Sequence, residues 1–171
     1  MHNILIIVFG KMYGSISMNK HIDLYTDGAT RANGTNKARG GWAWVYLSER
    51  GKISDYGGEI NTTNNRMELT AIINGIEAAR EQYKDYDLDM CIYSDSAYVI
   101  NCYKQEWYKK WQVNGWVNST KGPVANKDLW EKLIPYFEDR KFEFYKVKGH
   151  NVCELNNLAD KLACKGADEL K

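Results

Sequence analysis

The stretch Gly-Trp-Ala-Trp-Val-Tyr-Leu-Ser-Glu-Arg-Gly-Lys-Ile-Ser-Asp-Tyr-Gly-Gly-Glu-Ile, residues 41–60, decides the fold of this chain. Gly41 to Leu47 is rich in aromatic and apolar side chains, which favours a buried strand. Glu49 to Lys52 is typical of a hairpin turn, and Ile53 to Ile60 predicts a returning strand. The segment therefore predicts an antiparallel hairpin on which the rest of a sheet is built.

Three more strands are predicted outside this hairpin. Apolar and polar residues alternate from His21 to Thr26, which predicts a strand that ends at Asp27. Residues 28–41, rich in Gly, Asn and basic side chains, then predict a loop. Leu88 to Ser94 and Phe142 to Val147 predict the fourth and fifth strands.

Helical patterns alternate with the later strands. Leu69, Ile72, Ile73, Ile76 and Ala79 recur at helical spacing, which predicts a core-facing helix to about Tyr83. The polar residues at 62–64 are candidates for its N-cap. Further helices are predicted over 97–102, 126–138 and 155–163. Hairpin-linked strands followed by alternating helix and strand indicate a mixed sheet flanked by helices.

Length and composition point to one ordinary globular domain. The chain has 171 residues, and its 23 Lys+Arg nearly balance its 22 Asp+Glu, so net charge says nothing about nucleic acid. The four cysteines form no C-x-x-C pair, which favours free thiols in a reducing cytoplasm over a zinc site or disulfide framework.

The first 17 residues differ from the rest. Ile4 to Phe9 is apolar but far shorter than the roughly 20 residues that a membrane span needs. The segment lacks a basic n-region and a signal-peptide cleavage site. We therefore expect residues 1–17 to be a dispensable extension, residues 18–171 to form the domain, and the protein to be cytoplasmic with no membrane partner.

Four acidic residues in different local contexts carry the functional information. Asp27 and Asp95 each close an apolar, strand-like run, whereas Glu68 and Asp160 lie in helix-like surroundings. A carboxylate in such a position is costly unless a cation or hydrogen bonds compensate it. If the four converge, Mg²⁺, a hard ion with oxygen ligands, is the usual compensation. The sequence predicts a metal-dependent enzyme.

Five motifs, in order, resemble bacterial-type ribonuclease HI of the ribonuclease H family, over residues 18–163. They are Tyr25-Thr26-Asp27-Gly28, Thr63-Asn64-Asn65-Arg66-Met67-Glu68, Ser94-Asp95-Ser96-Ala97-Tyr98-Val99, Pro123-Val124-Ala125-Asn126-Lys127-Asp128-Leu129-Trp130 and Val147-Lys148-Gly149-His150. The resemblance implies an α/β fold: a single domain with a five-stranded mixed sheet and helices on both faces.

The resemblance also implies a reaction and its residues. The expected activity is endonucleolytic hydrolysis of the RNA strand of an RNA–DNA hybrid with two Mg²⁺ ions, for which Mn²⁺ substitutes, leaving 5′-phosphate and 3′-hydroxyl ends. Asp27, Glu68, Asp95 and Asp160 are similar to the metal-binding carboxylates of the family. His150 resembles its loop histidine, which assists proton transfer or product release, and an unperturbed imidazole titrates at a pH of about 6.5.

Contacts to each strand of the hybrid follow from the same resemblance. Asn33 and Asn64 match positions that face the RNA strand or the minor groove. The stretch 103–122, in which four lysines outnumber one glutamate, resembles a basic protrusion that contacts the DNA strand. The predicted DNA-strand contacts are Tyr98 and Trp107 at deoxyribose, Lys109 and Lys110 in the protrusion, and Thr63 and Asn126 in a phosphate pocket.

Structural roles stay open for several of these residues. Thr63 and Asn126 are equally suited to be helix caps, and Asn64 can combine a cap with its predicted contact. Trp111 and Trp116 are expected to pin the protrusion to the body of the domain.

Two other functions stay open: another nuclease or integrase-like enzyme on the same fold, and a catalytically silent hybrid-binding module. The basic, Trp-rich insertion argues against an integrase, and the presence of all four acids argues against a silent module. We expect a monomer without an obligate protein partner.

Overall fold

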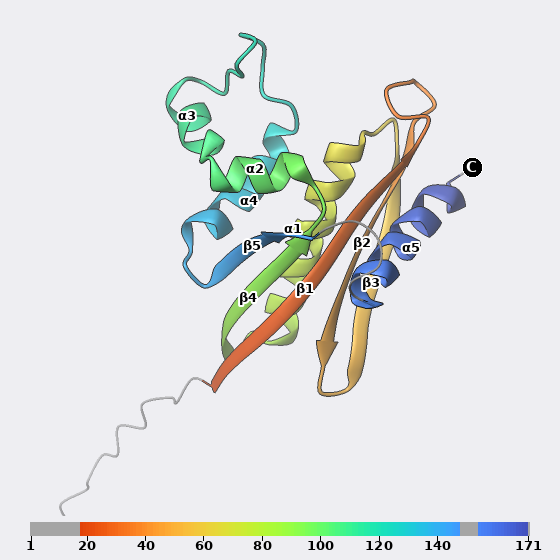
Figure 1. Ribbon diagram of the computed structural model, residues 1–171, viewed down its shortest axis with the longest axis vertical. Coiled ribbons are helices and arrows are strands. Elements are labelled where there is room, and N and C mark those ends of the chain that lie inside the picture. Colours follow the sequence, from red (N-terminus) through yellow and green to blue (C-terminus); the bar gives the residue numbers. More distant parts are fainter. Residues whose placement is uncertain (1–17, 148–153, 171) are drawn as a thin grey trace, which may run out of the picture.

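A computed structural model of the protein describes residues 18–147 and 154–170 (Figure 1). The predicted dispensable extension, residues 1–17, lies outside this part of the chain. The elements, in order, are β1 Met18–Arg31, β2 Arg39–Ser48, β3 Gly51–Ile60, α1 Asn64–Gln82, β4 Tyr86–Ser94, α2 Ala97–Lys104, α3 Trp107–Val113, α4 Lys127–Glu138, β5 Phe142–Lys146 and α5 Glu154–Glu169.

One five-stranded sheet organises the molecule, with the strands in the order β3-β2-β1-β4-β5. β1, β2 and β3 form an antiparallel meander, and the turn between β2 and β3 is the one predicted from the sequence. β4 pairs with β1 in parallel, and β5 pairs with β4 in parallel. The long central strand β1 therefore joins the antiparallel and parallel halves, which confirms the predicted mixed sheet.

Helices cover both faces of the sheet. Trp44 and Tyr46 of β2 pack in the main core with Leu69 and Ile72 of α1. Val45, between them in the strand, packs in a second core with residues of α5. Because successive strand residues point to opposite faces, α1 and α5 lie on opposite sides of the sheet. Figure 1 shows α2, α3 and α4 gathered beyond β4 and β5.

The structure corrects the predicted boundary between the first two strands. β1 does not end at Asp27: it continues to Arg31, with Gly28 paired to Trp42, so the predicted loop over 28–41 is wrong. Only residues 32–38 connect the two strands. A Cβ on Gly41 would lie 2.0 Å from the Ala163 carbonyl oxygen of α5. The small residue there therefore serves close helix packing, not a turn.

The same packing explains the length of the last helix. The sequence predicts that it ends at Ala163, but α5 continues to Glu169. Ala163, Gly166 and Ala167 are buried, and a Cβ on Gly166 would lie 2.2 Å from the Gly57 carbonyl oxygen of β3. A run of small residues that suggests the end of a helix is instead the surface by which α5 rests on the sheet.

No helix within residues 18–147 and 154–170 is long and apolar enough to cross a membrane. Cys91, Cys102 and Cys164 are free thiols.

Candidate active site

Four segments that are distant in sequence bring carboxylates to the point where the parallel pairing of β1 with β4 ends. Asp27 lies in β1, Glu68 in α1, Asp95 directly after β4 and Asp160 in α5. The parallel pairing of β1 with β4 runs to Thr26 and Ser94, and Asp27 and Asp95 are the residues that follow these two. Carboxylate oxygens of Asp27, Glu68 and Asp95 all lie within 4.8 Å of one another. Asp160 is close enough to Asp27 to interact with its carboxyl group.

Gly28 allows this convergence. A Cβ at this position would lie 2.5 Å from the backbone nitrogen of Glu68, so only glycine lets α1 approach β1 this closely. The Gly28 N–H also donates to Asp27 Oδ1 at 2.9 Å. Gly28 therefore determines how closely Glu68 can approach Asp27.

The cluster concentrates negative charge in a poorly solvated place. Glu68 is 3% exposed, and burial raises its pKa well above the ordinary value, with Asp27 and Asp95 raising it further. Burial likewise raises the pKa of Asp27 to about 8, and Asp95 and Asp160 add to the shift. These carboxylates disfavour one another's ionised forms when no cation is present.

The donor set fits divalent metal ions. Glu68 Oε1 accepts a hydrogen bond from Asn64 Nδ2 at 3.4 Å. Among the described residues, Glu68 Oε2 is a buried oxygen that accepts no hydrogen bond. An unbonded buried oxygen is costly, and a hard cation such as Mg²⁺ takes this type of ligand. Asp27, Glu68, Asp95 and Asp160 would hold such ions.

Asn64 is hydrogen-bonded to Glu68, and Asn33 is hydrogen-bonded to Asn64. Asn33 Oδ1 accepts from the Asn64 backbone N–H, and Asn64 Oδ1 accepts from Thr30 Oγ1, each at 3.4 Å. The N-cap of α1 is Thr63, whose side chain accepts from the Arg66 N–H at 3.3 Å. Asn64 is therefore not the cap, and its side chain links Glu68 to β1.

Three predicted DNA-strand residues line one groove of about 550 Å³. Tyr98, Trp107 and Lys110 contribute to it together with the mostly apolar residues Trp111, Val117 and Val124. The Tyr98 hydroxyl accepts from Trp130 Nε1 at 3.1 Å, which fixes its ring. Lys109 does not line the groove: its Nζ lies 2.5 Å from Glu106 Oε1.

Trp111 and Trp116 pack α3 against the body of the domain. Trp111 is 8% exposed, and its ring centroid lies 5.4 Å from that of Trp130 in α4. Trp116 lies 6.2 Å from Trp111, centroid to centroid. These contacts agree with the anchoring role expected from the sequence.

Thr63 and Asn126 stand at the starts of α1 and α4. Arg66 of α1 links these two helix ends, because it pairs with Asp128 of α4 at 2.9 Å; it also pairs with Glu59 of β3 at 3.1 Å. Asn126 is the N-cap residue of α4, in the left-handed region with φ 58°, but its side chain makes no cap hydrogen bond. Of the three residues expected as caps, Thr63, Asn64 and Asn126, only Thr63 caps a helix through its side chain.

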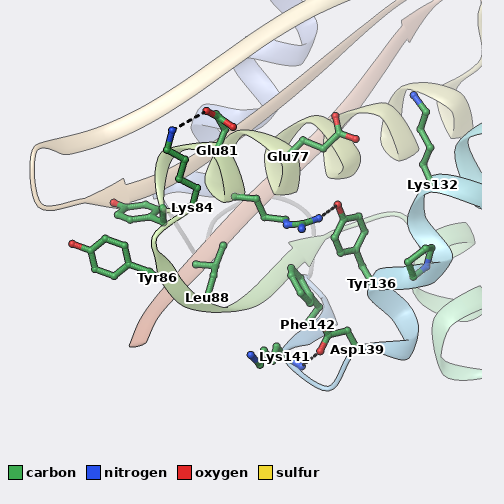
Figure 2. A pocket seen from close by; sticks show the side chains of 13 residues that line it. Glu77, Glu81, Lys84, Tyr86, Leu88, Lys132, Tyr136, Asp139, Lys141 and Phe142 are labelled. Atoms are coloured by element: carbon green, nitrogen blue, oxygen red, sulfur yellow. Dashed lines mark hydrogen bonds and ion pairs between the residues drawn. The ribbon is translucent and has the colours of Figure 1, made fainter. Parts of the chain in front are cut away.

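A further hollow of about 780 Å³ lies between α1, α4 and the start of β4 (Figure 2). None of the predicted site residues lines it. Arg80 Nη1 donates to the Tyr136 hydroxyl at 2.8 Å across it, and Lys84 pairs with Glu81 at 3.9 Å. Three of its charged groups, Arg80, Glu81 and Lys84, thus have partners within the protein, and we assign the hollow no function.

The predicted loop histidine, His150, lies outside the described residues. One cluster of side chains, in turn, lies outside the sequence predictions. His21, Asp23 and Cys91 form a second group of ligand-type side chains, which no sequence motif marks. The signal that points to them is cross-strand register, which a sequence does not show.

Comparison with known proteins agrees with this geometry. The ribonuclease H family model matches residues 19–168. A ribonuclease H of Thermoanaerobacter sp. (strain X514) is 46% identical over 142 residues, covering 83% of this chain and 86% of the relative. A ribonuclease H of Caldanaerobacter subterraneus subsp. tengcongensis is 43% identical, covering 85% and 90% respectively.

Solved structures share the fold at lower identity. LC9-RNase H1, a type 1 ribonuclease H with the type 2 active-site motif, superposes with a TM-score of 0.72 at 24% identity, covering 88% of this chain and 74% of that one. A foamy viral protease-reverse transcriptase, solved in complex with RNA/DNA hybrid, gives a TM-score of 0.67 at 23% identity and covers 85% and 20%. Sequence and fold agree that this chain belongs to the ribonuclease H family.

Proposed function

We propose that this protein hydrolyses the RNA strand of RNA–DNA hybrids by two-metal-ion catalysis, leaving 5′-phosphate and 3′-hydroxyl ends. The observation that carries the proposal is the convergence of Asp27, Glu68 and Asp95 around a buried, unbonded Glu68 oxygen. Membership of the ribonuclease H family supports the substrate class.

Each acid has a task in this proposal. When bound, two divalent ions lower the pKa of an attacking water and neutralise the charge on the leaving oxygen. Glu68, held by Asn64, offers a fixed buried ligand, while the exposed Asp95 leaves the substrate side open. Asp27 interacts with Asp95 and Asp160, and its carboxylate accepts a hydrogen bond from the Gly28 N–H. His150 would assist proton transfer or product release.

Selection of a hybrid requires one strand to be recognised as RNA and the other as DNA. Asn33 and Asn64, beside Glu68, place amide groups where the RNA strand would be cut, and amides can pair with a 2′-hydroxyl. Across the molecule, Tyr98 and Trp107 offer ring faces in the groove. A deoxyribose packs on such faces, and a 2′-hydroxyl would disturb that packing.

Phosphate contacts would hold the DNA strand. Lys110 at the groove neutralises a phosphate, and Thr63 and Asn126 present short polar groups at two adjacent helix ends, where anions are stabilised. Lys109 contributes less in this proposal because Glu106 already pairs with it.

A gel assay tests the function directly. RNA–DNA, RNA–RNA and DNA–DNA duplexes are incubated with Mg²⁺, Mn²⁺ or EDTA, and the product ends are identified by labelling with and without phosphatase. We expect cleavage of the RNA strand of the hybrid alone, with either ion and not with EDTA, and 3′-hydroxyl products. Specific hybrid binding without cleavage would favour the silent binding module instead.

Location and assembly are part of the same proposal. The free thiols of Cys91, Cys102 and Cys164 support a reducing compartment such as the cytoplasm. We propose a monomer, to be checked by light scattering on the untagged protein. A concentration-independent dimer mass would contradict it.

A further inference from the structure

The second cluster of ligand-type side chains, His21, Asp23 and Cys91, lies on the same sheet face as α5, in the part that α5 does not cover. In the described part of the chain, one nitrogen of His21, a carboxylate oxygen of Asp23 and the sulfur of Cys91 lie within 4.8 Å of one another. Asp23 of β1 is the register partner of Cys91 of β4, and His21 precedes Asp23 by two residues on the same face. Both His21 and Asp23 have about half of their side-chain surface exposed. An ion from solvent therefore has access to all three.

His21 is oriented as a metal-ligating histidine. Its Nδ1 lies 2.7 Å from Asp89 Oδ2, so an Nδ1–H donates to that carboxylate. Its Nε2 faces Asp23, at 3.5 Å from Oδ1. In metal sites, a carboxylate that accepts from one ring nitrogen fixes the tautomer and leaves the other nitrogen as the ligand. Asp89 is in the position of that carboxylate.

We propose that His21, Asp23 and Cys91 bind a borderline divalent metal ion, of which Zn²⁺ is the reference case, with Asp89 orienting His21. Imidazole, carboxylate and thiolate together suit Zn²⁺ or Co²⁺ rather than Mg²⁺, which takes oxygen ligands. Three protein ligands leave a fourth position open to water. Ligand atoms around a tetrahedral Zn²⁺ lie about 3.5 Å apart, so side chains within 4.8 Å need shift by only about 1 Å.

Glu143 and a pair of tyrosines border the site. Glu143 of β5 is the register partner of Cys91, and one of its carboxylate oxygens accepts from the Tyr145 hydroxyl. Tyr25 and Tyr93 follow Asp23 and Cys91 by two residues on the same face, and their rings stack with the centroids 4.8 Å apart. This aromatic wall separates the cluster from Asp27, two residues beyond Tyr25.

A metal-free alternative exists for the same geometry. An imidazolium between two carboxylates would also be stable, and the hydrogen bond with Asp89 raises the pKa of His21. Such an ion-pair bridge needs no sulfur ligand. Participation of the Cys91 thiolate is therefore the feature that separates the two.

Cobalt spectroscopy tests the proposal on the untagged, reduced full chain, with excess Mg²⁺ present to fill the carboxylate cluster. We expect one equivalent of Co²⁺ to give a thiolate-to-metal charge-transfer band, which Zn²⁺ then displaces. Cys91→Ser should abolish the band, and Asp89→Asn should weaken Co²⁺ affinity about 10–100-fold. Cys164→Ser, which removes another half-buried thiol, should retain it.

Circular dichroism of each variant shows that it is folded. A missing charge-transfer band in the wild-type protein, or a band that survives Cys91→Ser, would overturn the proposal. The readout does not involve cleavage. Failure of the metal-site proposal therefore leaves the proposed nuclease function untouched, and failure of the nuclease proposal leaves the metal site untouched.

Discussion

At the scale of single residues, the carboxylates that suit catalysis oppose the stability of the metal-free protein. Glu68 is buried with one oxygen unbonded, and Asp27 interacts with both Asp95 and Asp160. Such groups cost free energy in their ionised forms unless a cation binds. The proposed ions therefore stabilise the fold as well as activating water.

This cost predicts that the stability of the metal-free protein depends on pH. The pKa of Asp27 is raised from 3.8 to about 8, so the folded metal-free protein binds this proton more tightly than the unfolded chain does. The stability that this proton contributes is fully present below about pH 4 and is lost as pH rises to about 8. We expect the melting temperature in EDTA to fall over that range and Mg²⁺ to reverse the fall at pH 8.

Asp27→Asn removes the charge without changing the size of the side chain. In EDTA at pH 8 it should raise the melting temperature by about 2–4 °C for each kcal/mol of repulsion that it removes, the usual ratio in a domain of this size. Asp85→Asn, at an exposed surface carboxylate, is the control and should change little. A lower melting temperature for Asp27→Asn would show that the repulsion is absent.

At the scale of elements, the contact between β1 and α1 positions the site. Gly28→Ala would place a Cβ 2.5 Å from the Glu68 backbone nitrogen, so the helix must move. We expect stability to fall by about 1–3 kcal/mol. Cleavage should fall roughly 100-fold, since a displacement of about 1 Å at a reacting centre has that effect.

Gly122→Ala is the matched control, because its Cβ would make only ordinary contact, at 3.5 Å, with the Asn118 side chain. Melting curves and cleavage rates of both variants measure the effect. Wild-type activity in Gly28→Ala would contradict the role assigned to this close approach.

The α3 protrusion predicts a difference between two neighbouring lysines. Lys110 lines the groove, whereas Lys109 pairs with Glu106. Lys110→Ala should therefore weaken hybrid binding and reduce the slope of log K against log salt by about 0.7–1. Lys109→Ala should have the smaller effect, and Lys84→Ala, at the hollow of Figure 2, should have none.

Fluorescence anisotropy with a labelled hybrid at several salt concentrations measures these slopes. Equal effects of the Lys109 and Lys110 substitutions would show that the ion pair with Glu106 does not decide between them.

The types of the helices and strands were largely predictable from the sequence, but the ends of β1 and α5 were not. The helical stripe from Leu69 to Ala79 predicts α1 well, because burial follows a 3.6-residue period. Gly41 and Gly166 resemble chain breakers in sequence, yet they are packing surfaces between α5 and the sheet. A glycine's neighbours in space decide which role it has, and these are not visible in the local sequence.

At the scale of the whole molecule, the strand order brings distant segments together. Asp27 and Asp95 become neighbours because β4 lies parallel to β1, although a hairpin and a helix separate them in the chain. Family motifs made that convergence predictable. The meeting of His21 with Cys91 was not predictable, since it depends on the register of β1 against β4 and no motif marks it.

The boundary of the domain gives a prediction at the same scale. The family match begins at residue 19, and β1 begins at Met18. A protein that starts at Met18 should melt within about 2 °C of the full chain and cleave the hybrid within about twofold of its rate. A truncated protein that fails to fold would show that residues 1–17 are needed.

The most direct test of the central claim compares Asp27→Asn with the wild-type protein in cleavage and in binding of one RNA–DNA hybrid at saturating Mg²⁺. Metal-ion stabilisation supplies several kcal/mol, and each 1.4 kcal/mol is tenfold in rate. Cleavage should therefore fall at least about 100–1,000-fold while the dissociation constant for the hybrid changes little. Undiminished turnover in Asp27→Asn would contradict the assignment of these carboxylates to catalytic metal ions.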